Sequence, residues 1–379
     1  MNIDYLNRKI VIVGGNHHNT LSMVRCFGEC GIKVDLIVVG TVKGAAVRSK
    51  YVEMYYLVRD VEDVISVLMR NYANEINKAT IISCADDIAA QLDVHYSQLI
   101  SFFNFFHANE DNRVSKYMNK LVQVELAKDV GLHVPFTTIY QKGGDISFDN
   151  FPYLLKPLVS KDGGKRIHIC SSKEELEYLL VEQSEHYNIL VQEYIIKEYE
   201  IVVLGVSIND DVLLPGYIRK IRENKGGTTY ATVEDIGNLP FELIESCKLI
   251  IRKMGYEGLF GIEFIYNKGE YYFIEVNLRN DATCYALAKA GVNLPLIYFL
   301  AINGMDYRFY LTGKVSHLTS MVELKDFKFV LKGQVSLVKW MRELCKCDVL
   351  FYCNKEDMNP FWFSLFSFIV RPFCNILCK

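Results

Sequence analysis

An acid, an amide and an arginine alternate with apolar residues in the segment 271–281, YYFIEVNLRND. Side chains of a strand alternate between its two faces, so Glu275, Asn277 and Arg279 share one face, with successive members about 6.6 Å apart. Carboxylate and amide oxygens are ligands that Mg²⁺ prefers, and the planar guanidinium suits a carboxylate or an acyl phosphate. This face therefore predicts a metal and anion site. The opposite face, packed on the core, is predicted to carry Tyr272, Ile274, Val276 and Leu278.

A second carboxylate, Glu263, lies in the preceding predicted strand, GLFGIEFIY. A hairpin with a three-residue turn at 268–270 would place Glu263 directly opposite Glu275, whereas a two-residue turn would put it on the other face. Two opposed carboxylates repel, so this pairing makes sense chiefly if cations sit between them. We therefore predict a metal site made by Glu263, Glu275 and Asn277. An exposed edge strand with a polar face is the alternative.

Lys156 follows the apolar residues 153–155 at the end of another predicted strand, and a loop with Gly163 and Gly164 comes next. Burying a lysine among apolar residues is costly unless an anion meets it. A glycine loop allows backbone N–H groups to close over phosphates. The pattern predicts a phosphate site, and a lysine that simply reaches solvent is the alternative.

The stretch LVQEYIIKEYE ends a strand at Gln192, Glu193 and Tyr194, and Glu200 follows. The backbone after such a strand can hydrogen-bond an adenine, and a later carboxylate can accept both ribose hydroxyls. A solvated acidic turn explains the same residues.

The first 115 residues are predicted to form a Rossmann-like domain with a parallel sheet. The order is a strand at 9–13, Gly14 and Gly15, a helix at 21–30 and a second strand, KVDLIVVG, which is a βαβ unit. Ligands bind at the carboxyl ends of such strands, where the strand TIIS leads into Asp86 and Asp87. The turn GGNHHN is not G-x-G-x-x-G, which argues against a bound dinucleotide. His17 and His18 in this turn either face solvent or touch a substrate.

From Lys120 the pattern changes to that of an α+β domain. A helix ends at Gly131, and Ser172 with Glu175 forms a capping box that opens another helix. Two β-rich runs, NILVQEYI and EIVVLGVSI, follow.

Composition limits the classes of protein. A chain of 379 residues normally holds two or three domains, and its net charge of -3 argues against nucleic acid as the main partner. Eleven cysteines without a C-x-x-C pair, and a start without a long apolar run, predict a cytoplasmic protein with free thiols. The apolar residues 361–370 are too few to span a bilayer, which takes about 20, so a packed terminal helix is predicted. Contact with a membrane surface or a partner is the alternative.

In order and spacing, these groups resemble the ATP-grasp superfamily over residues 120–303. The resemblance implies a Rossmann-like pre-ATP-grasp domain at 1–115, an ATP-grasp domain at 116–310 and a C-terminal region at 311–379. It implies ATP and Mg²⁺ as cofactors, with two ions, and Mn²⁺ as an alternative metal. The implied phosphate ligands are Lys120 and Lys156, with Gly163 and Gly164 as the loop. The implied adenine hinge is Glu193, Tyr194, Ile195 and Ile196, with Glu200 on the ribose. The implied metal ligands are Glu263, Glu275 and Asn277, with Arg279 beside the substrate.

Four further stretches are similar to D-aspartate ligase-like and carbamoyl-phosphate synthetase-like carboxylate–amine ligases: LSMVRCFGECGIKV, AAVRSKYVE, YIRKIRENKGGTT and DVLFYCNKEDMNPFW. The third implies that Lys220 and Arg222 reach the triphosphate or the acyl phosphate. The tail departs from this pattern, because its apolar end is longer.

The implied reaction phosphorylates a substrate carboxylate and joins it to an amine, such as an amino acid, with ADP and phosphate as products. The implied partners are small-molecule substrates and further copies of the chain, as a homo-oligomer. The alternatives are a bicarbonate-using enzyme of the carboxylase or carbamoyl-phosphate type, and a nucleotide-binding protein that docks through its C-terminal helix.

Overall fold

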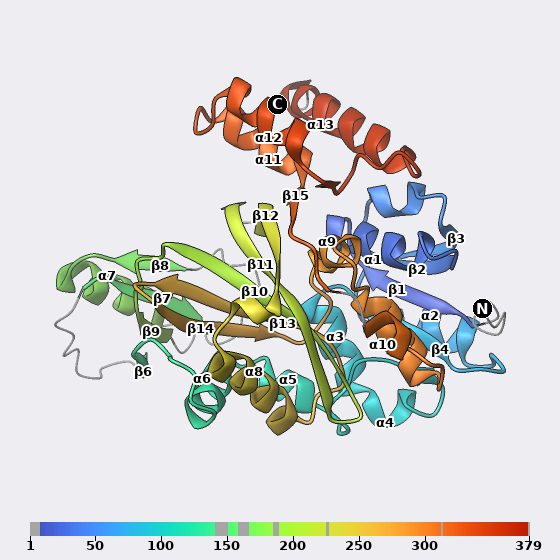
Figure 1. Ribbon diagram of the computed structural model, residues 1–379, viewed down its shortest axis with the longest axis horizontal. Coiled ribbons are helices and arrows are strands. Elements are labelled where there is room, and N and C mark those ends of the chain that lie inside the picture. Colours follow the sequence, from blue (N-terminus) through green and yellow to red (C-terminus); the bar gives the residue numbers. More distant parts are fainter. Residues whose placement is uncertain are drawn as a thin grey trace.

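The computed structural model describes residues 8–140, 151–157, 167–184, 189–224, 227–311 and 314–377. The first sheet is parallel and lies at the N-terminal end of the chain (Figure 1). Its strands, in the spatial order β3-β2-β1-β4-β5, are β1 (Ile10–Gly14), β2 (Val34–Val39), β3 (Val52–Val58), β4 (Ala79–Ser83) and β5 (Phe103–Asn104). The accompanying helices are α1 (His18–Gly28), η2 (Ala45–Arg48), α2 (Asp63–Tyr72), α3 (Asp86–Val94), α4 (Tyr96–Leu99) and α5 (Arg113–Tyr117).

Both faces of this sheet are covered, which explains the nearly continuous apolar strands. Ile12 packs into a cluster with Phe27 of α1, whereas its neighbour Val13 packs into a second cluster with Leu68 of α2. The predicted Rossmann-like parallel sheet is confirmed.

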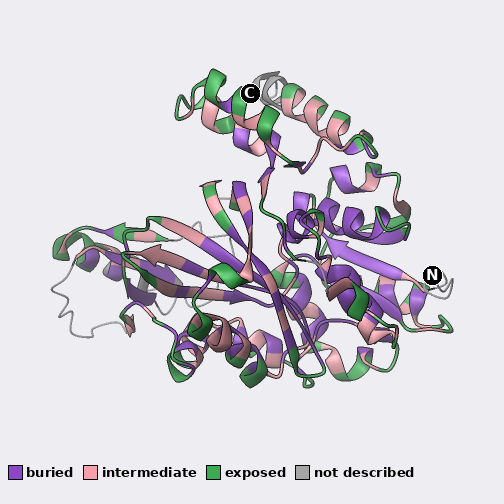
Figure 2. Ribbon diagram, in the orientation of Figure 1, coloured by how far each residue is buried: buried purple, intermediate pink, exposed green. Residues whose placement is uncertain are grey.

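The second sheet is mainly antiparallel, in the order β14-β13-β10-β11-β12-β15-β16. Its strands are β10 (Tyr199–Ile208), β11 (Asp211–Asn224), β12 (Gly227–Asp235), β13 (Gly258–Asn267), β14 (Glu270–Asn277), β15 (Leu318–Met321) and β16 (Val349–Leu350). The helical segments between β12 and β15 are η3 (Ile236–Asn238), α8 (Phe241–Met254), α9 (Cys284–Lys289), α10 (Leu294–Ile302) and η4 (Arg308–Leu311). Burial is concentrated along β10 and β13 and where α1 meets α10 (Figure 2).

A small third sheet has the order β6-β9-β7-β8. Its elements are β6 (Thr137–Tyr140), β7 (Tyr153–Pro157), β8 (His168–Cys170), β9 (Ile189–Glu193) and helix α7 (Lys173–Ser184), preceded by α6 (Lys120–Asp129). The predicted capping box is present in part, because the Glu175 N–H donates to Ser172 Oγ at 3.2 Å. The predicted end of α6 is also confirmed, since Gly131 has a φ of +79°.

The C-terminal helices α11 (Glu323–Leu331), α12 (Leu337–Lys346) and α13 (Asn359–Leu377) lie beyond the tip of β12 (Figure 1). They are fixed to α1 by Arg25, which is 0% exposed and has its Nε 3.1 Å from Asp357 Oδ2. The same guanidinium donates to the carbonyls of Phe351 and Tyr352 at 2.6 and 3.1 Å. Two stretches that sequence similarity singled out therefore meet in a structural anchor.

Over residues 359–370, helix α13 packs with part of its surface only. The Arg48 guanidinium lies 5.2 Å from the ring centroid of Phe363, but Trp362, Phe366 and Ile369 are exposed. Their spacing puts these three residues on one side of the helix. Of the helices in the described ranges, none has the length and apolar character needed to cross a membrane.

The domain limits at 115/116 and 310/311 stay predictions. A single apolar cluster continues from the first sheet into the second, for example where Phe27 of α1 meets Phe299 of α10 with ring centroids 6.1 Å apart.

Candidate functional site

The β13–β14 hairpin places Glu263 directly opposite Glu275, as predicted, but by a different route. The turn has two residues, Lys268 and Gly269, both at positive φ (+48° and +92°), so the predicted three-residue turn is wrong. A β-bulge at Ile274 adds one residue to the edge strand β14 and restores the pairing.

The same bulge changes which residues of β14 face the core. Phe273 is 0% exposed and packs in one cluster with Val276 and Leu278. The prediction that Tyr272 and Ile274 share this face is wrong, because the inserted residue reverses the alternation before the bulge.

Glu263 shares its two oxygens between an amide and a lysine. Its Oε1 accepts from Asn277 Nδ2 at 2.9 Å, and its Oε2 accepts from Lys220 Nζ at 2.8 Å. Burial raises the pKa of Glu263; Lys220 opposes this shift and the facing Glu275 adds to it. A further cation placed between the two carboxylates would therefore be favoured.

Lys120 and Lys156 both lie near Glu275. The Nζ of Lys120 is 3.6 Å from Glu275 Oε2, and Lys156, 4% exposed, donates to Gln192 Oε1 at 2.8 Å. Burial lowers the pKa of Lys156 to about 8, and Lys120 adds to this effect. Burial alone would raise the pKa of Glu275, but Lys120 and Lys156 with other nearby cations hold it below its ordinary value.

Helix α6 is attached to β14 through Gln123. Its Nε2 donates to the Val276 carbonyl and its Oε1 accepts from the Val276 N–H, both at 2.9 Å. Because Lys120 begins the same helix one turn earlier, this contact sets the position of Lys120 beside Glu275.

Lys220 joins the predicted ribose carboxylate to the predicted metal carboxylate. Its Nζ is 2.9 Å from Glu200 Oε2, its partner on β10, as well as 2.8 Å from Glu263. Burial opposes ionisation of Glu200, but Lys220 and Lys197 together lower its pKa to about 2. Burial alone would lower the pKa of Lys220, yet Glu263 and Glu200 hold it well above its ordinary value.

Arg222 does not join this group. A β-bulge at Ile221 places Lys220 and Arg222 opposite consecutive residues of β12, and these face opposite sides of the sheet. The Arg222 guanidinium instead forms two hydrogen bonds to the buried Asp326, at 3.0 and 2.7 Å. Its predicted role at the phosphates is therefore not supported by its position.

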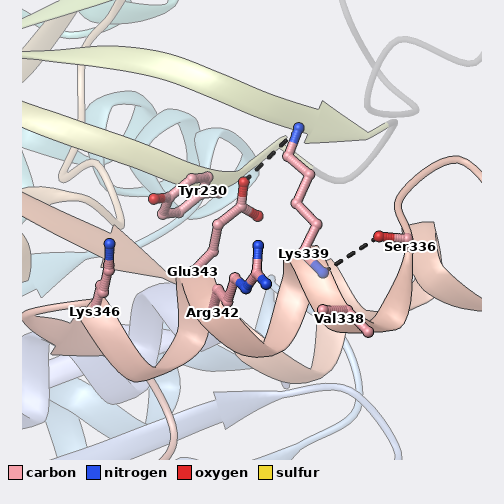
Figure 3. A pocket seen from close by; sticks show the side chains of 7 residues that line it. All are labelled: Tyr230, Ser336, Val338, Lys339, Arg342, Glu343 and Lys346. Atoms are coloured by element: carbon pink, nitrogen blue, oxygen red, sulfur yellow. Dashed lines mark hydrogen bonds and ion pairs between the residues drawn. The ribbon is translucent and has the colours of Figure 1, made fainter.

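Arg222 also lies 2.7 Å from Glu343, which borders a cavity of about 380 Å³ between β12 and α12 (Figure 3). The cavity is lined by Tyr230, Ser336, Val338, Lys339, Arg342, Glu343 and Lys346. It is thus separate from the carboxylates of β13 and β14.

Arg279 connects the two large sheets. Its Nε donates to Asp86 Oδ1 at 2.7 Å, at the start of α3, and its Nη2 donates to Asn277 Oδ1 at 3.3 Å. Burial opposes its charge, but Asp86 and Asp281 raise the pKa of Arg279. The predicted substrate arginine therefore lies where the carboxyl end of the parallel sheet meets β14.

The predicted adenine hinge follows β9. Glu193 donates its N–H to the Phe136 carbonyl at 2.8 Å, and Tyr194 donates to the Pro152 carbonyl at 3.1 Å. The amides of Glu193 and Tyr194 are therefore already engaged within the protein. The predicted loop glycines Gly163 and Gly164 lie outside the described residues.

The donor set fits a hard divalent cation in part. Glu263 and Glu275 offer carboxylate oxygens, but Asn277 turns its Nδ2 toward Glu263, so its amide must rotate before its oxygen can serve as a ligand. Within the described ranges, no group of three or more His, Cys, Asp and Glu side chains could hold a metal. Such an ion would therefore be held by two carboxylates, with waters and phosphate oxygens completing its shell, which suits Mg²⁺.

Sequence reasoning missed the supporting roles of Gln123 and Gln192 and the pairing of Asp86 with Arg279. A signal existed for Gln192, because an amide inside the apolar strand ILVQE is unusual. Nothing local marks Gln123, and the Asp86–Arg279 contact joins residues far apart in the chain.

Comparison with known proteins finds a known domain in this chain. The model of the ATP-grasp domain matches residues 117–283. The carbamoyl phosphate synthase large chain of Clostridium perfringens is 28% identical over 155 residues, which cover 39% of this chain and 14% of that protein. D-alanine–D-alanine ligase of Fusobacterium nucleatum is 28% identical over 170 residues, covering 42% and 55%. The chain thus spans a small part of the first of these relatives and about half of the second.

Solved structures agree in fold. N5-carboxyaminoimidazole synthetase from Staphylococcus aureus, complexed with ADP, superposes with a TM-score of 0.66 at 14% identity, covering 86% of this chain and 85% of that one. The L-amino acid ligase from Bacillus licheniformis gives 0.61 at 14% identity, covering 82% and 78%. The matched region thus identifies an ATP-grasp domain at residues 117–283, and the solved structures agree with it in fold.

Proposed function

We propose that this chain is an ATP- and Mg²⁺-dependent ligase that joins a carboxylate to an amine. The observation that carries the proposal is the facing pair Glu263 and Glu275, with Lys120 near Glu275, Lys220 on Glu263 and Arg279 beside them. Phosphoryl transfer asks the protein mainly for positioning and charge neutralisation, and this group supplies both.

In the proposed reaction, a carboxylate oxygen attacks the γ-phosphorus of ATP, and ADP leaves. The amine nitrogen then attacks the carbonyl carbon of the acyl phosphate; phosphate leaves and the amine proton passes to solvent. Lys120 and Lys156 bind phosphate oxygens, and Glu200 accepts the ribose hydroxyls. Glu263 and Glu275 would hold Mg²⁺, which would supply positive charge to neutralise the phosphates.

Arg279 orients the reacting carboxylate. Its guanidinium now pairs with Asp86, so a substrate carboxylate must replace or share that partner. An amino acid as one substrate is favoured by the similarity to a D-alanine–D-alanine ligase in sequence and to an L-amino acid ligase in fold.

The test is ADP release from ATP and Mg²⁺ with pooled carboxylates and amines. The parent should release ADP, and Glu275→Gln should reduce the rate about 10²-fold while keeping the parent's circular dichroism spectrum. Glu125→Gln, at an exposed position of α6, is the matched control. Equal turnover by Glu275→Gln would remove the metal assignment, and no ADP release with any pair would refute the ligase.

Bicarbonate chemistry is the second candidate, favoured by the match to a carbamoyl phosphate synthase large chain. ATP turnover that depends on bicarbonate, without any other carboxylate, would select it.

A nucleotide-binding protein without turnover is the third candidate, favoured by the exposed Trp362, Phe366 and Ile369 of α13. Flotation with anionic vesicles, for the parent and for a variant with Trp362→Ser, Phe366→Ser and Ile369→Ser, tests docking of this helix on a membrane. Nucleotide binding without hydrolysis would select this candidate.

A further inference from the structure

Basic side chains meet at the start of α1. Lys325 Nζ of α11 lies 2.7 Å from His17 Nε2. The ring of His18, which is 3% exposed, lies 3.9 Å from that of His17, and its buried Nδ1 has no hydrogen-bond partner. Among the described residues, no ion pair joins Lys325 to a carboxylate, and the charge that contributes to its pKa shift is that of a further cation, Lys328.

The surroundings of this cluster disfavour the positively charged forms of its side chains. Burial lowers the pKa of Lys325 to about 8, and Lys328 adds to the effect. Burial, followed by His17 and Lys325, lowers the pKa of His18 well below its ordinary value. A bound anion would reverse these shifts.

The hydrogen bonds lead to the same conclusion. His17 Nδ1 accepts the N–H of Asn19 at 3.2 Å, so Nε2 is the ring nitrogen that faces Lys325, at 2.7 Å. Two basic groups thus lie in contact, and an anion bound beside them would favour their charged forms.

The cluster lies close to the proposed reaction centre along a line of hydrogen bonds. Asn19 Nδ2 donates to the carbonyls of Cys84 and Asn280, both at 3.0 Å. Asn280 follows Arg279, which pairs with Asp86. This line follows the carboxyl end of the parallel sheet, where open α/β sheets bind ligands.

We propose that Lys325 and His17 form a subsite for an anionic group that does not react, a carboxylate or a phosphate carried by one of the two substrates. The inference rests on the proposed ligase function. It implies that at least one substrate carries an anionic group in addition to the group that reacts. An amino acid that reacts through its amine is an example.

Matched substrate pairs test the subsite. ADP release is measured with each amino acid against its amide, and with phosphoethanolamine against ethanolamine. The parent should show a KM at least about tenfold lower for the anionic member of one pair. Lys325→Met should raise that KM about tenfold while leaving the kcat and the KM for the neutral member unchanged. Lys325→Arg should keep the preference, and Lys332→Met, at the exposed end of α11, is the matched control.

Equal use of acids and amides by an active parent would overturn the subsite and leave the ligase standing. If no pair is ligated, a second measurement decides. Inorganic phosphate is titrated into protein saturated with ADP and Mg²⁺, and calorimetry in two buffers of different ionisation enthalpy measures the protons taken up on binding. Proton uptake by the parent that Lys325→Met lacks supports the subsite. Identical binding and no uptake by both proteins refute it.

Discussion

The cluster around Glu263 and Glu275 and the cluster around Arg25 and Asp357 are both made of buried charges, but they differ in what they leave available. Asp357 accepts from Arg25, from Ser49 Oγ at 2.8 Å and from the Lys50 N–H at 3.0 Å, so its oxygens are fully engaged. At the other cluster, two carboxylates face one another, and the pKa values of Glu263, Lys156 and Lys220 are all shifted. A closed set of partners indicates a structural role, whereas an unbalanced set indicates a place for a ligand.

Breaking the closed cluster should have the largest effect on stability. Arg25→Met leaves Asp357 buried without its cation, and the free energy of unfolding should fall by about 3–5 kcal/mol. Urea denaturation measures this change, with Arg59→Met at an exposed position as the control. The double variant with Asp357→Leu should recover part of the loss. A loss below about 1 kcal/mol for Arg25→Met would contradict a structural role.

Lys220 and Arg222 of β11 extend the comparison. Because of the bulge at Ile221, Lys220 belongs to the cluster around Glu263, whereas Arg222 belongs to a closed set of partners around Asp326. Lys220→Met should reduce ATP turnover about 10²-fold. Arg222→Met should lower the free energy of unfolding by about 3 kcal/mol, since it leaves Asp326 buried without its cation, and keep the turnover of the folded protein close to the parent's. The reverse result, with Arg222 controlling turnover, would restore the predicted role at the phosphates.

The smallest expected effect is on the free energy of unfolding at acidic pH. The pKa of Glu200 is lowered from 4.5 to about 2 in the folded protein, so its stabilisation is complete above the unfolded value and is lost as pH falls through that interval. Urea unfolding at several pH values between about 2 and 5 should show a slope that flattens in Glu200→Gln. An unchanged slope would mean that the ion pairs with Lys220 and Lys197 do not stabilise the folded state.

Local patterns predicted much of the fold, because periodicity and glycine positions are written into short stretches. The strand at 9–13 and the end of α6 at Gly131 are examples. The superfamily was predicted for the same reason, since its chemistry uses acids and lysines at characteristic spacing.

Bulges and long-range contacts could not be predicted from local sequence patterns. Ile274 and Ile221 look like ordinary strand residues, yet each reverses the alternation on one side of it. One bulge corrected a wrong turn and the other moved Arg222 away from the site. The contacts of Arg279 with Asp86 and of Lys325 with His17 join residues far apart in the chain, and only the folded structure brings them together.

The anchor between Arg25 and Asp357 also has a consequence for synthesis. Arg25 is synthesised early in translation, but its partner Asp357 follows 332 residues later in the chain. A ribosome therefore releases α1 long before the partner of its buried charge exists. A chain that stops before residue 357 carries a helix that cannot be buried without an unpaired ion, so α1 should complete its packing among the last elements and remain a target for chaperones and proteases until then.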